Sequence, residues 1–85
     1  MRDRLTVPKR QMDVLRFIDS FVDEHNKSPT AEEIKEGIGI ESKGAAHGHL
    51  SRLRDRGLVT WVKYEFRTIR LTEAGTEQVR KGLPF

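Results

Sequence analysis

The sequence predicts a mainly α-helical fold that carries one small β-hairpin near its C-terminal end. Apolar residues recur at helical spacing over residues 14–22, and helix-capping signals follow one another over residues 28–57. β-branched and aromatic residues then gather over residues 58–71. A chain of 85 residues has the length of one domain, and we expect residues 1–85 to form a single one.

The first helix is predicted over about residues 8–25. Thr6-Val7-Pro8 is typical of a helix start, because the N–H that proline lacks has no partner in the first turn of a helix. An apolar stripe then follows the spacing of one helix face. We expect this stripe to face the core; it consists of Val14, Leu15, Phe17, Ile18, Phe21 and Val22.

The second helix is predicted over about residues 31–38. Ser28-Pro29 is extended, because a residue before proline avoids the helical region. Thr30 and Glu33 then form a capping box, in which each side chain accepts a hydrogen bond from the other residue's backbone N–H. Ile34 and Ile38 should point inward, and Gly39 favours the left-handed conformation that ends a helix.

The third helix begins after Ser42, which is a favourable N-cap, and ends at Gly57. Its core stripe is Ala46, Leu50 and Leu53. The second and third helices are joined by a tight turn, so residues of about 31–56 form a helix-turn-helix.

A β-hairpin follows the helix-turn-helix over about residues 58–71. Its two strands, Leu58–Val62 and Arg67–Leu71, are joined by a short polar segment. A hairpin in this position makes the fold a winged helix-turn-helix. A short last helix is predicted over about residues 73–81, although Gly75 weakens it, and Gly82-Leu83-Pro84-Phe85 ends helical structure.

With these elements in place, the chain resembles the N-terminal DNA-binding domain of LexA-type repressors. The resemblance runs in one register from about Val7 to Leu71. It rests on Lys9-Arg10-Gln11, Ser28 to Ile34, Ile38-Gly39, Ser42 with Ala45-Ala46, His49-Leu50, Arg56 to Val59, and Arg67 to Leu71. It implies that the third helix docks in the major groove of DNA while the wing touches the backbone. It carries over neither the peptidase domain of such repressors nor the dimer contact which that domain makes.

The expected base-reading positions depart from the family pattern. Where that pattern typically has asparagine and then two consecutive glutamates, this chain has Gly44, His47 and Gly48. The resemblance therefore implies DNA binding with a target sequence other than the usual one.

Helix geometry places a small, uncharged face opposite the core stripe of the third helix. At about 100° per residue, Gly44, Gly48 and Ser51 point away from the core, flanked by His47 and Arg52. Such a face lets the helix approach base edges closely. We expect the bases to be lined by Ser42, Gly44, Ala45, His47, Gly48 and Ser51, and the phosphates to be held by Thr30, Lys43, Arg52, Lys63 and Arg67.

The charge pattern favours the same partner, double-stranded DNA. Residues 11–41 carry three basic and eight acidic side chains, a net charge of −5, whereas residues 42–71 carry seven basic and two acidic ones, a net charge of +5. A domain built in this way has two electrostatic faces, and its basic face suits a polyanion.

Several assignments stay open beside this one. The third helix could be an ordinary solvated helix, with Arg54 and Arg56 flanking Asp55 in water. Trp61 and Phe66 could pack back on the first or the last helix. The whole domain could instead bind a protein, with Tyr64 and Phe66 as anchors and the last helix as a dimer contact; a homodimer on two DNA half-sites is a further alternative.

Other classes of function lack their signals. There is no cysteine, and His47 and His49 diverge by about 200° around a helix, so we expect no metal. No catalytic set of side chains, cofactor motif or small-molecule site is evident, and we expect no enzyme. No apolar run approaches the ~18 residues that span a membrane, and the charged N-terminus is not a signal peptide. We expect a cytoplasmic protein.

Overall fold

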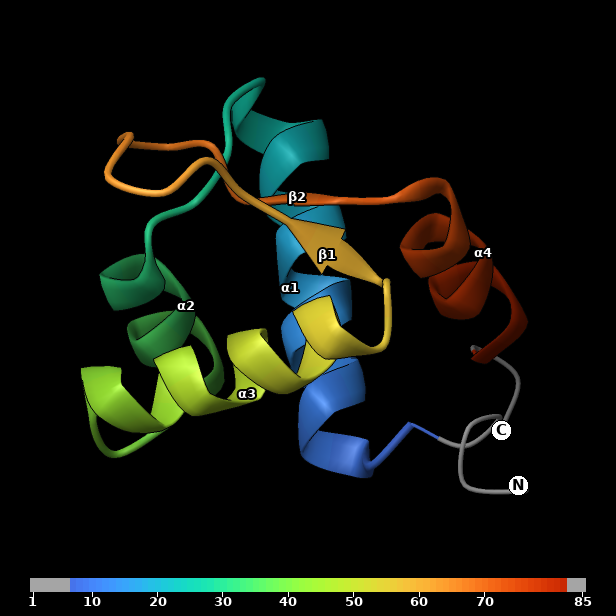
Figure 1. Cartoon of the computed structure of the whole chain (residues 1–85), viewed down its shortest axis with the longest axis horizontal. Coiled ribbons are helices and arrows are strands. Elements are labelled where there is room, and N and C mark those ends of the chain that lie inside the picture. Colours follow the sequence, from blue (N-terminus) through green and yellow to red (C-terminus); the bar gives the residue numbers. More distant parts are fainter. Residues whose placement is uncertain (1–6, 83–85) are drawn as a thin grey trace.

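The fold is a three-helix core joined to a two-stranded hairpin and a fourth helix. A computed structural model describes residues 7–82. Figure 1 shows the chain order of its elements, which are α1 (Lys9–His25), α2 (Ala31–Ile38), α3 (Lys43–Asp55), β1 (Val59–Thr60), β2 (Arg70–Leu71) and α4 (Glu73–Gly82). This order confirms the winged helix-turn-helix fold class. The predictions made for Thr6 and for residues 83–85 lie outside the described residues.

Local capping explains where α2 and α3 begin and end. The Thr30 hydroxyl accepts a hydrogen bond from the Glu33 N–H at 3.1 Å, and the Glu33 carboxylate accepts one from the Thr30 N–H at 2.9 Å. Ser42 Oγ accepts a bond from the Ala45 N–H at 3.0 Å. Gly39 and Gly57 follow the two helices with φ of 75° and 78°, which is costly for other residues.

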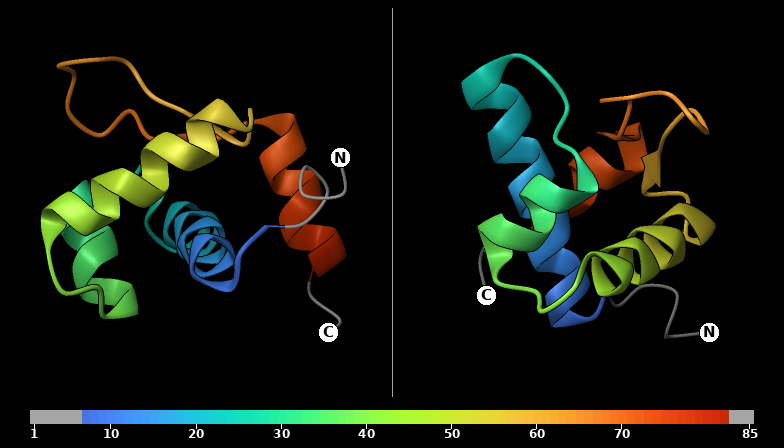
Figure 2. Two further views of the ribbon diagram at one scale, coloured as in Figure 1. Left: turned by 60° about the horizontal axis from the view of Figure 1, so that its bottom comes forward. Right: turned by 90° about the vertical axis from the view of Figure 1, so that its left-hand side faces the viewer.

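α1 is the central element of the core. Figure 2 shows it almost end-on, with α2, α3 and α4 around it. The buried apolar side chains come from every helix and from the start of the hairpin: Met12, Val14, Leu15, Ile18, Ile34, Ala46, Leu50, Leu53, Leu58, Val59 and Val79.

The predicted stripe of α1 was too long at its C-terminal end. Val22 is 38% exposed, and Phe17 and Phe21 are only half-buried. The last turns of α1 rise beyond α2 and α3 (Figure 1), so part of the stripe has no helix to face. There the Phe21 ring lies between the rings of Phe17 and His25, with centroids 5.7 and 4.3 Å away.

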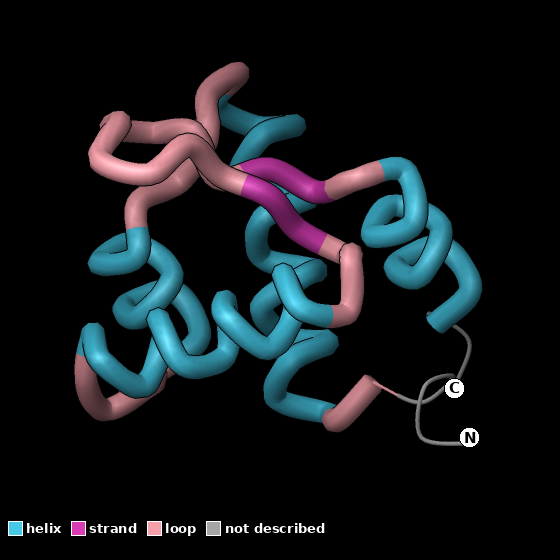
Figure 3. The backbone as a smooth tube through the Cα atoms, viewed as in Figure 1, coloured by secondary structure: helices cyan, strands magenta, loops and turns pink. Residues whose placement is uncertain are grey.

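The hairpin is shorter than predicted. Only Val59 with Leu71 and Thr60 with Arg70 pair, in antiparallel register. Figure 3 shows the long connection between the two strands, residues 61–69, which we call the wing loop. Its backbone leaves the extended region at Tyr64 (φ 67°) and at Arg67 (φ 55°), so the ladder cannot continue through it.

Thr68 replaces the missing ladder inside the wing loop. Its hydroxyl oxygen accepts a hydrogen bond from the Val62 N–H at 2.9 Å and lies 3.3 Å from the carbonyl oxygens of Val62 and Glu65. A single side chain therefore ties the two sides of the loop together.

α4 closes the core on the side of α1 opposite α2. The Thr72 hydroxyl accepts a bond from the Gly75 N–H at 3.0 Å and donates one to the Gly57 carbonyl at 2.7 Å. A Cβ at position 75 would collide with the Leu58 carbonyl, so the glycine that weakens the helix in sequence terms is what lets α4 approach this closely. Within residues 7–82, no helix combines the length and the apolarity needed to cross a bilayer.

Candidate nucleic-acid interface

α3 presents one face to the core and another to solvent. Ala46, Leu50 and Leu53 have no exposed surface, as predicted. On the outer side the backbone or side chains of Lys43, Gly44, Ala45, His47 and Arg52 are exposed, and Gly48 and Ser51 are half-buried. Seven of the predicted contact residues thus lie along the outside of one helix.

The two glycines of α3 are not required by packing inside the protein. A Cβ at position 44 would come no closer than 3.9 Å to Ser42 Oγ, and one at position 48 no closer than 3.7 Å to Arg52 Nη1. Both are ordinary van der Waals distances. A glycine in a helix costs about 0.5–1 kcal/mol relative to alanine. Packing within the described residues therefore does not account for this cost.

The wing loop displays aromatic rings. Tyr64 is 95% exposed and Phe66 is 76% exposed. The idea that Phe66 packs back on a helix is therefore wrong, because the turn at Tyr64 and Arg67 directs this part of the loop outward. Lys63 is also exposed, with its Nζ 5.4 Å from the centre of the Tyr64 ring.

Trp61, at the base of the wing loop, does pack against the core. The Arg54 guanidinium lies 4.7 Å from the centre of its ring, while Arg54 Nε is 3.9 Å from the Asp55 carboxylate. Arg54 is thus more than a solvated neighbour of Asp55, since its contact with Trp61 links α3 to the hairpin.

A groove of about 600 Å³ separates the wing loop from the start of α2 and the exposed side of α3. Thr30 from α2's N-cap, Lys43 and His47 from α3, and Tyr64 from the wing loop all line it. Sequence reasoning placed these residues on separate elements, and the structure brings them to one concave surface. Acidic residues also line the groove, among them Glu33.

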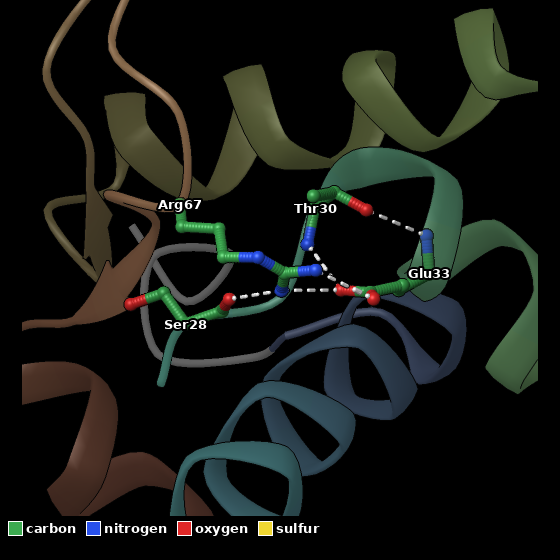
Figure 4. Close-up of polar contacts among 4 residues, drawn as sticks. All are labelled: Ser28, Thr30, Glu33 and Arg67. Atoms are coloured by element: carbon green, nitrogen blue, oxygen red, sulfur yellow. Dashed lines mark hydrogen bonds and ion pairs between the residues drawn. The ribbon is translucent and has the colours of Figure 1, made fainter. Parts of the chain in front are cut away.

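Arg67 also lines the groove, and its side chain, which is 24% exposed, is paired with α2. Its guanidinium makes two bonds to the Glu33 carboxylate, Nη1 to Oε1 at 2.8 Å and Nη2 to Oε2 at 3.0 Å, and Nη1 also donates to the Ser28 carbonyl at 2.9 Å (Figure 4). These contacts pair the guanidinium with α2 in the free protein, and the proposal that Arg67 holds a phosphate stays a prediction. Neither the helical nor the strand pattern could reveal its partner, which lies 34 residues away.

The same contacts explain the acidity of Glu33. Hydrogen bonds from the Arg67 guanidinium, and then from the Thr30 N–H, lower the pKa of the Glu33 carboxyl from 4.5 to about 2. Glu33 is thus ionised at neutral pH, and its charge is paired where it borders the groove.

His49 lies beside the core stripe of α3 and is a packing residue. It is half-buried, and its Nδ1 is buried without a hydrogen-bond partner. Burial, and then the charges of Arg52 and Arg10, lower the pKa of the His49 imidazole. Within the described part of the chain no group of three histidine, cysteine or acidic side chains is arranged to hold a metal ion.

A helix-turn-helix followed by a two-stranded wing, with one face of its second helix exposed, is the architecture of winged helix-turn-helix domains. Within this class, the chain belongs to the LexA DNA binding domain family, whose model matches residues 3–68.

Curated relatives agree with this assignment. The LexA repressor of Ligilactobacillus salivarius (strain UCC118) is 41% identical over 71 residues, which are 84% of this chain and 34% of the relative. That of Bacillus subtilis (strain 168) is 45% identical over 51 residues, 60% of this chain and 25% of the relative. That of Bacillus velezensis (strain FZB42) is 37% identical over 74 residues, 87% of this chain and 36% of the relative. The matched part is about a third of each relative or less.

Proposed function

We propose that this protein is a transcriptional repressor that binds double-stranded DNA sequence-specifically through α3 and the wing loop. The observation that carries the proposal is the exposed outer face of α3 in a chain of this family; Lys43 and His47 of α3 also line the groove shared with the wing loop. α3 would lie in the major groove, with Ser42, Gly44, Ala45, His47, Gly48 and Ser51 against the bases.

The phosphates would be held by Thr30, Lys43, Arg52 and Lys63. The three cations lie at the start of α3, on its outer side and on the wing loop. They can therefore contact the DNA backbone on both sides of the major groove. The Thr30 hydroxyl accepts the capping bond and keeps its own proton to donate. Phosphate contacts set the register and most of the affinity, while the base edges set the specificity.

Salt dependence tests the proposal directly. Each neutralised phosphate contributes about −0.9 to the slope of log K against log salt, so three cations predict a slope of about −3. Fluorescence anisotropy with a random-sequence duplex between ~50 and ~200 mM salt measures it. Binding that is absent at ~50 mM, or that does not weaken with salt, contradicts the proposal.

The placement of the interface is tested by Arg52→Ala and Lys63→Ala. Each should weaken binding to all sequences several-fold and reduce the salt slope by about 1, because each removes one phosphate contact. Arg80→Ala is the matched control, since Arg80 is exposed on α4 and outside the groove. If both interface variants bind like the wild type, the DNA lies against another surface.

A second candidate function is a winged-helix module that binds a protein. The exposed rings of Tyr64 and Phe66 favour it, because aromatic side chains are frequent anchors of protein interfaces. Tyr64→Ala combined with Phe66→Ala separates the two functions. This second function is supported if the wild type has no affinity for DNA and the double variant loses a protein partner that the wild type binds.

The remaining parts of the proposal concern chemistry and setting. We propose no catalytic activity and no cofactor for residues 3–68, the part of the chain that matches the DNA-binding domain. We further propose that the protein acts in the cytoplasm and that two copies occupy one operator.

A further inference from the structure

The wing loop is attached to the helix-turn-helix by a polar network as well as by apolar packing. Residues 61–69 lie outside the two-pair ladder, which ends at Thr60 and Arg70. Near the C-terminal end of this loop, the Arg67 guanidinium crosses to the start of α2. There it meets the Glu33 carboxylate and the Ser28 carbonyl (Figure 4).

Residues of α2 and of the wing loop both contribute to this network. The Glu33 carboxylate that accepts from Arg67 also accepts from the Thr30 N–H, so the ion pair and the capping box of α2 share one side chain. The two side chains are only 24% and 33% exposed, and the Phe66 ring lies 5.0 Å from the guanidinium. Planar, two-pronged pairing of this kind fixes orientation as well as distance.

The backbone at Arg67 supports the same conclusion. Its φ of 55° lies in the left-handed region, where residues other than glycine, asparagine and aspartate are uncommon. Such a conformation persists when the surrounding contacts determine it. The guanidinium contacts of Arg67 are the ones that would do so here, since they join this position to α2.

We propose that Arg67 and Glu33 are a positioning pair for DNA binding: they hold the wing loop at a set distance from α2, across the groove from Thr30 and Lys43, and so fix where the loop presents Lys63. This inference rests on the proposed function. Arg67 acts through the wing loop and touches no phosphate. Holding the loop in place before binding removes the entropy cost of ordering it on the DNA.

The charge of Glu33 allows a test in which simple electrostatics and the positioning pair predict opposite changes in DNA affinity. Glu33→Gln removes a negative charge beside the proposed DNA site, which by simple electrostatics should tighten binding. The positioning pair predicts instead that binding weakens about 5- to 20-fold, because a neutral amide cannot hold the guanidinium as a carboxylate does. Gln keeps an oxygen that accepts from the Thr30 N–H, so the cap of α2 is retained.

Glu36→Gln is the matched control. Glu36 is exposed on the same helix and does not line the groove, and its loss should leave binding unchanged or slightly tighter. The assay is anisotropy with a fluorescein-labelled, random-sequence 20-base-pair duplex at about 100 mM salt, a range in which phosphate contacts are resolved. Binding by Glu33→Gln that equals or exceeds that of the wild type overturns the inference.

Arg67→Gln distinguishes positioning from direct contact. A positioning role predicts a similar loss of affinity with an unchanged salt slope, and a double variant with Glu33→Gln no more than about twofold weaker than the weaker single variant. A phosphate contact predicts a slope reduced by about 0.9 and losses that do not depend on Glu33. The second result overturns the inference.

The chain's one tryptophan, Trp61, lies in the wing loop and reports on it without DNA. Acrylamide quenching of its fluorescence should rise in Glu33→Gln and Arg67→Gln but not in Glu36→Gln, with far-UV circular dichroism unchanged. Unchanged quenching in the first two variants overturns the inference. If the wild type itself shows no salt-dependent binding, the proposed function fails too; wild-type binding that both variants retain overturns the positioning pair alone.

Discussion

At the scale of single residues, the Glu33 carboxylate is the group whose contacts and pKa are most useful for testing the structure. Its carboxylate serves α2 through the Thr30 N–H and serves the wing loop through Arg67. Because both contacts favour the ionised form, they lower the pKa of this carboxyl to about 2. A lowered pKa in the folded state links stability to pH in one direction only.

The stabilisation that Glu33 contributes should be lost in acid. In the unfolded chain the carboxyl has a pKa near 4.5, so between pH 4.5 and 2 the unfolded state binds more protons than the folded state. Unfolding free energy therefore falls as pH drops through this window, and the contribution of Glu33 is constant above it. Urea denaturation of the wild type and of Glu33→Gln should show a difference that is steady from pH 5 to 8 and shrinks below it. A difference that grows in acid contradicts this assignment.

The partner of Arg67 marks the limit of sequence reasoning at this scale. Thr30, Ser42 and Gly39 could be assigned from sequence because each acts on atoms within four residues. Arg67 carries the same charge as a phosphate-binding residue would, and its actual partner is distant in the chain. Only the fold shows that the wing loop turns this side chain inward.

At the scale of elements, helices were more predictable than strands. The bounds of α2 follow from its own caps, and the apolar stripe of α3 follows from its period. The predicted strands were too long, because β-branched composition does not show which residues pair. The turn at Tyr64 and Arg67 also uses no glycine that would signal it. The exposed face of α3 was visible in the sequence, but the groove opposite the wing loop was not.

The glycines of α3 give the test at this scale. Gly48→Ala should raise the free energy of unfolding by about 0.5–1 kcal/mol, since helix propensity improves and the added methyl group meets nothing closer than Arg52 Nη1 at 3.7 Å. Its affinity for DNA should fall, because the methyl group stands on the face proposed to lie against the bases. Chemical denaturation should therefore show a gain in stability, and DNA anisotropy should show a loss of affinity.

Gly75→Ala is the contrasting control for the glycine test. There a Cβ would collide with the Leu58 carbonyl, so the protein should lose stability, by about 1–3 kcal/mol as for other overpacked sites. If Gly48→Ala is more stable and binds DNA like the wild type, its glycine is incidental to the interface.

At the scale of the whole molecule, surface composition bears on how copies assemble. Within residues 7–82 the exposed large apolar side chains are Val22 on α1 and Val62, Tyr64 and Phe66 in the wing loop. Three of these four side chains lie in the wing loop of a molecule whose Cα extents are 33 × 25 × 24 Å. Stable dimers bury about 1,200–2,000 Å² in total, with an apolar centre, and four exposed side chains would make a small apolar centre for such an interface.

We therefore predict that the protein is a monomer when free and that two copies meet on DNA. Successive major grooves on one side of a duplex are about 34 Å apart, close to the long dimension of the molecule, 33 Å.

Sedimentation velocity at tens of micromolar should give one monomeric species. Selection from a random DNA pool should return an inverted repeat that binds two copies, and a duplex carrying one half-site should bind one. Adding about 5 base pairs between the half-sites would place the copies on opposite sides of the duplex and abolish any cooperativity between them. A dimer in the absence of DNA would contradict this prediction.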